Sequence, residues 1–274
     1  MEKIILLLSF FLLSFFCNAS GKVNAEYSIT SLYSGKVGKS RITMNLTVSN
    51  ETIFGSYIYN EFKKNILLNG AYSAKSIVLY EELGDSMALI NLKPTADGYK
   101  GEWCGKMCIP VTLSSHDSFK YGPLSSVKIS GYGNGSYELT IGFKNNSVKI
   151  FLPESIDTPT IDFMDINGDG FYDIIARTDH RPNNGSQDVY LFTSKGYVKN
   201  KILSSVNGTL VYNPYNKYIV FNSKDDCCER YSKTIYSFNN SQLFKINSMF
   251  FDYSNSRGYS ENGSDVIKFE FESY

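Results

Sequence analysis

The sequence predicts an all-β protein, because strand-forming residues and turn residues alternate along its whole length. Of its 274 residues, 21 are Tyr and 19 are Phe, and aromatic residues favour strands. Short clusters of Asn, Gly and Ser separate apolar runs that are each about one strand long. No eleven-residue window shows a helical spacing of apolar residues. We therefore expect an antiparallel β-meander domain followed by a propeller-like or sandwich-like β domain.

The N-terminus has the pattern of a secretory signal peptide, which we place at residues 1–19. Lys3 precedes an apolar run over residues 4–16, and small residues, Cys17 and Ala19, precede the expected cleavage point. The run is shorter than the roughly 20 residues that span a bilayer. We expect a periplasmic or secreted protein that is not embedded in the membrane. Lipidation at Cys17 is the open alternative, although Phe16 stands where a lipidation signal has a small residue.

The expected N-terminal β domain covers residues 20–115. Residues 41–48 alternate, with Ile42, Met44 and Leu46 on one face and polar side chains on the other. Further runs of strand length follow, separated by turn residues. They lie at residues 55–59, 65–68, 76–80, 87–92, 98–103 and 109–113. The polar segment at 114–123 is the predicted boundary.

The expected C-terminal domain covers residues 124–274. Asn134-Gly135 predicts a two-residue hairpin turn between strands at 127–129 and 137–143. A weak echo links residues 190–199 to residues 236–245, and its period is close to that of a propeller blade. The remaining strands are expected at residues 148–152, 161–164, 172–176, 189–192, 218–221, 234–238, 243–246 and 267–271.

One segment of this second domain has the residues of a calcium-binding loop. Counted from Asp165, oxygen-bearing side chains occupy positions 1, 3, 5 and 9, and Gly170 at position 6 permits a sharp turn. Calcium prefers six to eight oxygen ligands, and position 7 supplies its backbone carbonyl. The strand-like flanks make this an EF-hand-like loop in a β setting. The expected ligands of a Ca²⁺ ion are Asp165, Asn167, Asp169, the carbonyl of Phe171, and Asp173.

The cysteines downstream of the expected signal peptide are Cys104, Cys108, Cys227 and Cys228. An even number of cysteines in an exported protein indicates disulfides, and four cysteines allow three connectivities. We expect two local bonds, Cys104–Cys108 and Cys227–Cys228. Cross-bridges between the two pairs remain the alternative.

Charge and motif content exclude several function classes. Lys and Arg together number 27, as do Asp and Glu, so the basic excess that nucleic-acid binding needs is missing. The sequence has no Gly-x-Ser-x-Gly, His-Glu-x-x-His or phosphate-binding glycine motif. Its two histidines are His116 and His180, and neither stands in a catalytic pattern. We expect a protein that is not an enzyme.

Residues 161–174 and 236–243, taken with the cysteine pair at 227–228, resemble a family of exported proteins that carry calcium loops. These are the proteins related to periplasmic I-type lysozyme inhibitors, including immunity proteins against peptidoglycan hydrolases. Segments at 55–59, 66–70, 77–81, 101–103 and 110–113 resemble the β domain that often precedes that region. The resemblance implies a calcium-binding protein that binds and inhibits a peptidoglycan hydrolase or lysozyme. An exported adhesion or glycan-binding β module is the alternative.

A contact residue can also be suggested. Tyr172 follows the Phe171 carbonyl, and a rigid calcium loop would display it to a protein partner. Packing of Tyr172 inside the fold is the competing interpretation, because most tyrosines of β proteins are half-buried.

Overall fold

The computed structural model describes residues 22–83, 86–181, 184–224, 229–262 and 265–270. This part of the chain is almost entirely β-structure, with one short helix, α2 (Lys201–Ser204). The predicted all-β class is confirmed. No helix in these ranges is both long enough and apolar enough to cross a membrane. The expected signal peptide and Cys17 lie outside the described residues.

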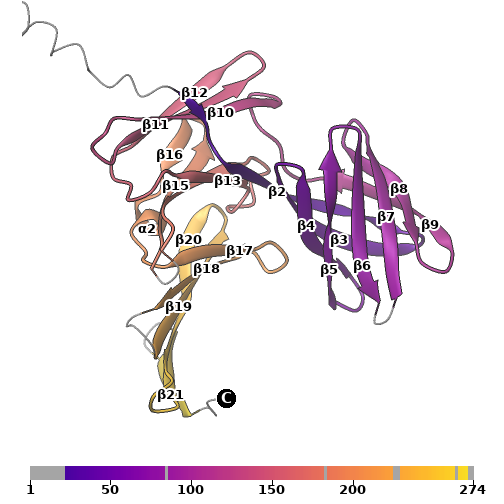
Figure 1. Cartoon of the computed structure of the whole chain (residues 1–274). Coiled ribbons are helices and arrows are strands. Elements are labelled where there is room, and N and C mark those ends of the chain that lie inside the picture. The colour runs from indigo at the N-terminus through magenta and orange to yellow at the C-terminus, as the bar shows by residue number, and fades with distance from the viewer. Residues whose placement is uncertain (1–21, 84–85, 182–183, 225–228, 263–264, 271–274) are drawn as a thin grey trace, which may run out of the picture.

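The N-terminal meander closes into an antiparallel barrel (Figure 1). Each strand pairs with the next in sequence, and β9 pairs back onto β2 through Val37↔Val111 and Tyr33↔Ser115. The meander was predicted, whereas its closure was not. The barrel strands are β2 (Tyr27–Val37), β3 (Ser40–Ser49), β4 (Thr52–Tyr59), β5 (Asn65–Ser73), β6 (Ser76–Leu83), β7 (Ser86–Pro94), β8 (Gly98–Cys104) and β9 (Cys108–Ser115).

The barrel interior is filled by the apolar side chains of every second residue. Ile42, Met44 and Leu46 of β3 are buried there, as their alternation predicts. The interior also holds one buried carboxylate, that of Glu81. Its Oε2 accepts hydrogen bonds from Tyr57 Oη at 2.9 Å and from Trp103 Nε1 at 2.7 Å. Trp103, the single tryptophan, is therefore hydrogen-bonded to a residue of the barrel core.

A sandwich-like unit follows the barrel. One layer contains β1 (Val23–Asn24), β10 (Leu124–Gly131), β11 (Tyr137–Phe143) and β12 (Ser147–Leu152). The other contains β13 (Thr160–Met164), β14 (Asp173–Asp179), β15 (Ser186–Thr193) and β16 (Gly196–Lys199). Residues such as Leu139, Ile141, Phe163 and Ile174 from both layers form one buried cluster. This two-layered arrangement matches the sandwich-like form that the sequence predicts for the second domain.

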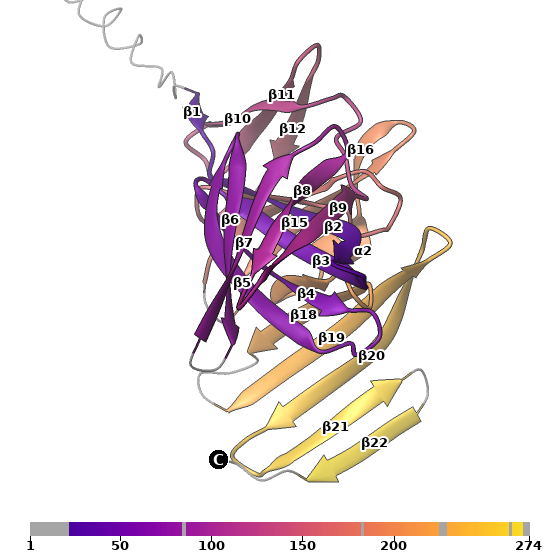
Figure 2. The same cartoon turned by 90° about the vertical axis from the view of Figure 1, so that its right-hand side faces the viewer.

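A third sheet completes the described chain. Its strands are β17 (Thr209–Asn213), β18 (Tyr218–Lys224), β19 (Arg230–Asn239), β20 (Gln242–Asp252), β21 (Arg257–Asn262) and β22 (Asp265–Glu270). Leu210 and Phe221 pack with Ile175, Val189 and Leu203. The far end, β21 and β22, extends away from the rest of the molecule (Figure 2). The two segments of the sequence echo lie in different sheets, the first in β15 and β16 and the second in β19 and β20.

The N-terminal strands join the barrel to the sandwich. β9 ends at Ser115, where the sequence predicts the end of the first domain. However, β1 pairs with β10, and the start of β2 pairs in parallel with β13 through Tyr27↔Ile161 and Ile29↔Phe163. Residues 23–29 therefore belong to the second unit, and β2 is shared by both.

Candidate metal centre and the cavity beside it

The predicted calcium loop connects β13 to β14 and lies next to the barrel end of β2. β13 ends at Met164 and β14 begins at Asp173, so the expected ion ligands lie in the connection between two paired strands and at the first residue of β14. Gly168 has φ +77° and Gly170 has φ +85°. Residues that carry a Cβ atom rarely adopt these φ angles, so both glycines are needed for the turn.

Side-chain oxygens at the first positions of the loop accept hydrogen bonds from its own backbone. Asp165 Oδ1 accepts from the N–H of Gly168 at 2.7 Å, and its Oδ2 accepts from Gly170 at 2.7 Å. Asn167 Oδ1 accepts from the N–H of Asp169 at 3.0 Å, and Asp169 Oδ1 accepts from Phe171 at 2.9 Å. These bonds fold the three side chains over the turn and fix their directions.

Asp173 anchors the loop from inside the protein. Its side chain is fully buried, its Oδ2 accepts from the N–H of Ile166 at 3.0 Å, and its Oδ1 accepts from Phe192 on β15 at 2.8 Å. Burial raises the pKa of Asp173 well above its ordinary value, and burial also raises the pKa of Asp165. Among the ion pairs of the described residues, none includes Asp165, Asp169 or Asp173.

The donor set suits a hard cation, because it consists only of oxygens. An ionised carboxylate offers about four lone-pair sites, so the backbone hydrogen bonds leave acceptor capacity on each aspartate. The carboxylate oxygens of Asp165, Asp169 and Asp173 do not form a group within 4.8 Å of one another. In the described chain, only Glu102, Cys104 and Cys108 meet that criterion.

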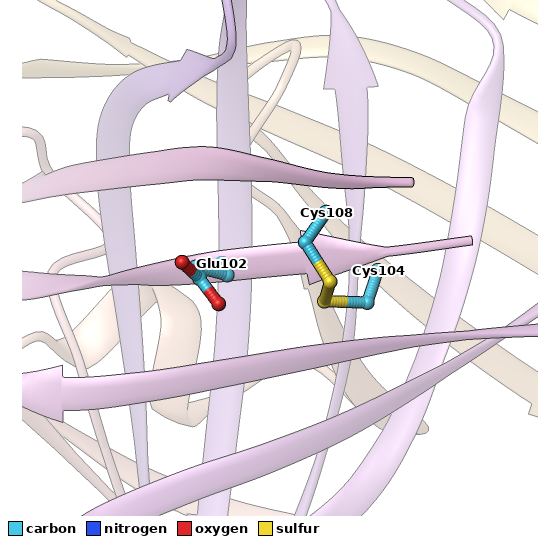
Figure 3. Close-up of side chains that lie close together, drawn as sticks. All are labelled: Glu102, Cys104 and Cys108. Carbon is cyan, nitrogen blue, oxygen red and sulfur yellow. A yellow bond between two sulfur atoms is a disulfide. The ribbon is translucent and has the colours of Figure 1, made fainter. Parts of the chain in front are cut away.

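The group at Glu102 is not a metal site, because its two cysteines are bonded to each other (Figure 3). The disulfide Cys104–Cys108 joins the end of β8 to the start of β9, where the two residues are register partners. This confirms one of the two predicted local bonds and leaves no thiolate for a metal. Cys227 and Cys228 lie outside the described residues.

Tyr172 packs inside the fold. Its side chain is 7% exposed, and its hydroxyl lies 2.5 Å from Ser31 Oγ. The centre of its ring lies 4.5 Å from the centre of the Phe119 ring. The structure therefore contains the packed alternative, and Tyr172 is not a candidate contact residue. Alternation explains the difference, because Tyr172 directly precedes β14 and faces the sandwich core. The neighbouring Phe171 is half-buried, with Lys120 Nζ 4.9 Å from its ring centre.

The segment after β9 ties the loop to the barrel. The N–H of Ser118 donates to the Gly170 carbonyl at 3.1 Å, and Tyr172 N–H donates to the Ser118 carbonyl at 3.1 Å. One residue earlier, Asp117 Oδ2 accepts from the N–H of Leu32 on β2 at 2.6 Å. Sequence reasoning missed Asp117, because only the tertiary contact with β2 distinguishes it from an ordinary polar turn residue.

A cavity of about 290 Å³ lies between the loop and the barrel. Asp117, Asp165 and Asp169 supply its carboxylates, and burial raises the pKa of Asp117 to about 7. The β17–β18 hairpin closes another side, held to the barrel by the hydrogen bond from Tyr215 Oη to the Ser56 carbonyl at 2.6 Å. The remaining lining residues are Thr30, Leu32, Asn45, His116, Met164, Gly168, Gly170, Tyr212, Pro214 and Lys217.

Comparisons with known proteins leave the family open. No protein family matches the chain, and no curated protein matches it. A solved Xanthomonas protein, described as related to a type IV secretion system, is 19% identical over 89% of this chain and 99% of its own, with a TM-score of 0.33. A proposed 6-phosphogluconolactonase from Bacteroides uniformis is 10% identical over 88% of this chain and 95% of its own, with a TM-score of 0.26. At these TM-scores the similarities carry no argument about fold or function.

Proposed function

We propose that this protein is an exported calcium-binding protein that binds a peptidoglycan hydrolase or lysozyme and inhibits it by covering its active site. The observation that carries the proposal is the Asp165–Asp173 loop. Its oxygen-bearing side chains are oriented by backbone N–H groups of the loop and, for Asp173, also of β15, and its aspartates belong to none of the described ion pairs. The family resemblance of the sequence supplies the partner class.

The proposed ion would be held by Asp165, Asn167, Asp169, the Phe171 carbonyl and Asp173. Bound calcium supplies positive charge that offsets the repulsion between the carboxylates and so stiffens the turn. The chain itself holds the loop in place, because Asp173 bonds to β15 and Ser118 bonds to Gly170. A surface that is ordered before docking loses less conformational entropy on binding, which favours inhibition by occlusion.

Calcium binding is tested by isothermal titration of chelator-treated protein with CaCl₂. We expect one site per chain in the wild type and no measurable site in Asp169→Ala. Asp157→Ala is the matched control, because Asp157 is an exposed carboxylate outside the loop, and it should bind calcium as the wild type does. A wild type that gives no heat signal in the titration and shows no calcium-dependent change in melting temperature would contradict the assignment.

Inhibition is tested by following the clearing of a purified peptidoglycan suspension by a lysozyme. We expect the mature protein to slow clearing stoichiometrically in calcium, and to slow it less in chelator or with Asp169→Ala. The Asp157→Ala control should inhibit fully. Unchanged clearing by every peptidoglycan hydrolase tested, with calcium bound, would reject the inhibitor function while leaving the calcium site standing.

One observation favours a glycan-binding module as the second candidate. Tyr132 and Phe151 are 57% and 59% exposed, and their ring centres lie 6.2 Å apart on the β10–β12 layer. Exposed aromatic pairs stack well on sugar rings. Retention of the wild type, but not of Tyr132→Ala, on a peptidoglycan-oligosaccharide column in the absence of hydrolase would favour this function.

A further inference from the structure

Each of the two histidines of the chain lies within hydrogen-bonding distance of a hydroxyl group, but only one of them also has a carboxylate beside its ring. His180 Nε2 lies 3.0 Å from Thr160 Oγ1, and His180 Nδ1 lies 3.5 Å from Asp157 Oδ2. His116 Nε2 lies 2.6 Å from Ser34 Oγ, and no ion pair of the described residues includes His116. Thr160, His180 and Asp157 therefore place a hydroxyl, an imidazole and a carboxylate in series.

The carboxylate sets the tautomer of His180. A carboxylate beside Nδ1 favours the tautomer that carries its proton on Nδ1 and leaves Nε2 as an acceptor. The Thr160 hydroxyl then donates to Nε2, which is the arrangement in which an imidazole takes the proton of a nucleophile. Asp157 is held in place, because its Oδ2 accepts the His180 backbone N–H at 2.8 Å. The separation of 3.5 Å at Nδ1 exceeds a hydrogen bond, and catalytic hydrogen bonds are often this long before a substrate binds.

The pairing of β13 with β14 brings the three residues together. Thr160 is the first residue of β13, His180 directly follows β14, and Asp157 lies three residues before β13. The Asp165–Asp173 loop joins the other ends of the same two strands, so the three residues lie away from the proposed calcium site. They form no local sequence motif, which is why the sequence predicts a protein that is not an enzyme.

The same three residues line one cavity, whose volume of about 780 Å³ is in the usual range of small-molecule sites. Arg181 lines it too. In the described contacts, Nε and Nη2 of Arg181 lie 2.7 and 2.5 Å from Asp179 Oδ2, and Nη1 is not engaged. The guanidinium group therefore has donors for a negative charge that develops in the cavity. The other lining residues are Asn24, Ala25, Glu26, Thr158 and Pro159.

We propose that this cavity hydrolyses small carboxylic esters, an activity beyond the proposed inhibition, with Thr160 as nucleophile and His180 as general base. His180 Nε2 takes the hydroxyl proton while Thr160 Oγ1 forms a bond to the ester carbonyl carbon. The carbonyl oxygen becomes negative and is stabilised by Arg181. Collapse of this intermediate breaks the bond to the ester oxygen, and His180 gives its proton to the leaving alcohol.

A water molecule completes the reaction. It attacks the carbonyl carbon of the acyl group on Thr160 and gives one proton to His180 Nε2. The bond from the carbonyl carbon to Oγ1 breaks, His180 returns the proton to Oγ1, and the carboxylic acid leaves. Asp157 does not touch the substrate, so it acts as a positioning residue that holds the imidazole ring and its tautomer.

The lining selects among esters. Ala25 and Pro159 are its apolar residues, whereas the remaining residues are polar or charged. A short acyl group on a polar alcohol therefore fits this cavity better than a long aliphatic chain.

The first experiment measures hydrolysis of p-nitrophenyl acetate by the mature protein. We expect saturable hydrolysis by the wild type and slower hydrolysis of p-nitrophenyl decanoate. Thr160→Val keeps the shape of the side chain without its hydroxyl and should lose the saturable activity, whereas Thr160→Ser should retain it. His180→Gln should lower kcat at least about 100-fold. His116→Gln, the matched control for an exposed imidazole, should leave the rate unchanged.

The positioning role of Asp157 has its own readout. Asp157→Asn should lower kcat at least about tenfold and leave KM unchanged, because the substrate contacts remain. Glu154→Gln removes an exposed carboxylate outside the cavity and should alter neither constant. Near-ultraviolet circular dichroism checks that each variant is folded. A rise in KM with kcat unchanged would reject the positioning role.

The second experiment labels the nucleophile with an alkyl fluorophosphonate, which forms a bond to an activated hydroxyl oxygen with loss of fluoride. We expect one adduct per chain, located on Thr160 by peptide mapping, absent from Thr160→Val and present on Ser in Thr160→Ser. An adduct on a different residue, no adduct, or equal ester hydrolysis by Thr160→Val and the wild type would overturn the proposal.

The two proposed activities can fail separately. Thr160→Val should still inhibit a lysozyme, and Asp169→Ala should still hydrolyse the ester, because the two sites lie at opposite ends of the β13–β14 pair. A wild type that inhibits a lysozyme but hydrolyses no ester rejects this inference alone. A wild type that hydrolyses the ester through Thr160 but inhibits no hydrolase rejects the proposed function alone.

Discussion

At the scale of single residues, Asp173 and Asp169 belong to one loop but have opposite surroundings. Asp173 is fully buried and accepts two backbone hydrogen bonds, whereas Asp169 is exposed. Asp173 therefore holds the loop to β15 in addition to being a proposed ion ligand, whereas Asp169 is a proposed ligand that bonds only within the loop. The losses of stability caused by substituting these two residues should differ most when calcium is absent.

We expect Asp173→Ala to lower the free energy of unfolding by about 2–4 kcal/mol in chelator, because it leaves the N–H groups of Ile166 and Phe192 buried without an acceptor. Asp169→Ala should cost less than about 1 kcal/mol under the same conditions. Urea unfolding followed by Trp103 fluorescence measures both. Equal losses in the two variants would contradict the anchoring role of Asp173.

The buried carboxyl of Asp117 makes the calcium-free protein sensitive to pH. Burial raises its pKa from the ordinary value of 3.8 to about 7, so between these values the folded protein binds more protons than the unfolded chain. Stability therefore falls as pH rises from about 4 to 7. Asp173 and Asp165 add to the fall, because their pKa values are raised in the same direction.

We expect Asp117→Asn to lose less stability than the wild type between pH 5 and pH 8 in chelator. The amide does not titrate, and its oxygen still accepts the Leu32 N–H. Melting temperatures at intervals across this range give the comparison, with Glu154→Gln as the control that should follow the wild type. A slope unchanged by Asp117→Asn would show that this carboxyl is not the titrating group.

At the scale of elements, the Cys104–Cys108 bond closes a very short loop at the end of the β8–β9 hairpin. Chain entropy predicts about 2 kcal/mol from a loop of this length. The interior of the barrel depends little on the bond, because its buried residues come from the other barrel strands and from β9, and β8 adds only the partly buried Tyr99 and Trp103.

We expect the double variant Cys104→Ser, Cys108→Ser to remain folded and to lose at most about 2 kcal/mol of unfolding free energy. Near-ultraviolet circular dichroism checks that the aromatic core is retained, and urea unfolding gives the energy. Loss of the tertiary signal at 25 °C would show that the bond is needed for the fold.

At the scale of the whole molecule, β2 couples the barrel to the sandwich. It pairs with β3 and β9 in the barrel and with β13, whose end begins the Asp165–Asp173 loop. Asp117 and Ser118 add a second connection between the loop and β2. Calcium binding to the loop should therefore stabilise the barrel as well.

We expect calcium at a hundredfold excess over its dissociation constant to add about 2.7 kcal/mol and to raise the melting temperature by about 5–10 °C. The shift should be seen by Trp103 fluorescence, although Trp103 lies in the barrel, and it should equal the shift seen by far-ultraviolet circular dichroism. Two separate transitions, with only one shifted by calcium, would contradict the coupling. Asp169→Ala serves as the variant in which neither signal moves.

The sequence alone determined the class of structure and the local elements. Alternation at residues 41–48 predicted which side chains of β3 enter a core, because the side-chain period of a strand is two. Glycines and aspartates at fixed spacing predicted the position of the loop and the connection it fills, because their backbone and capping preferences act locally. The short separation of Cys104 and Cys108 likewise made their bond predictable from the sequence.

Only the tertiary structure decided how distant strands pair and which polar residues meet. Closure of the barrel by β2 and β9, and the pairing of β2 with β13, join residues far apart in sequence, and no local preference encodes such pairs. The burial of Tyr172 and the role of Asp117 follow from those pairings, because each depends on what β2 brings against it. A residue's type and neighbours state what it can do, and long-range packing decides which of those possibilities it realises.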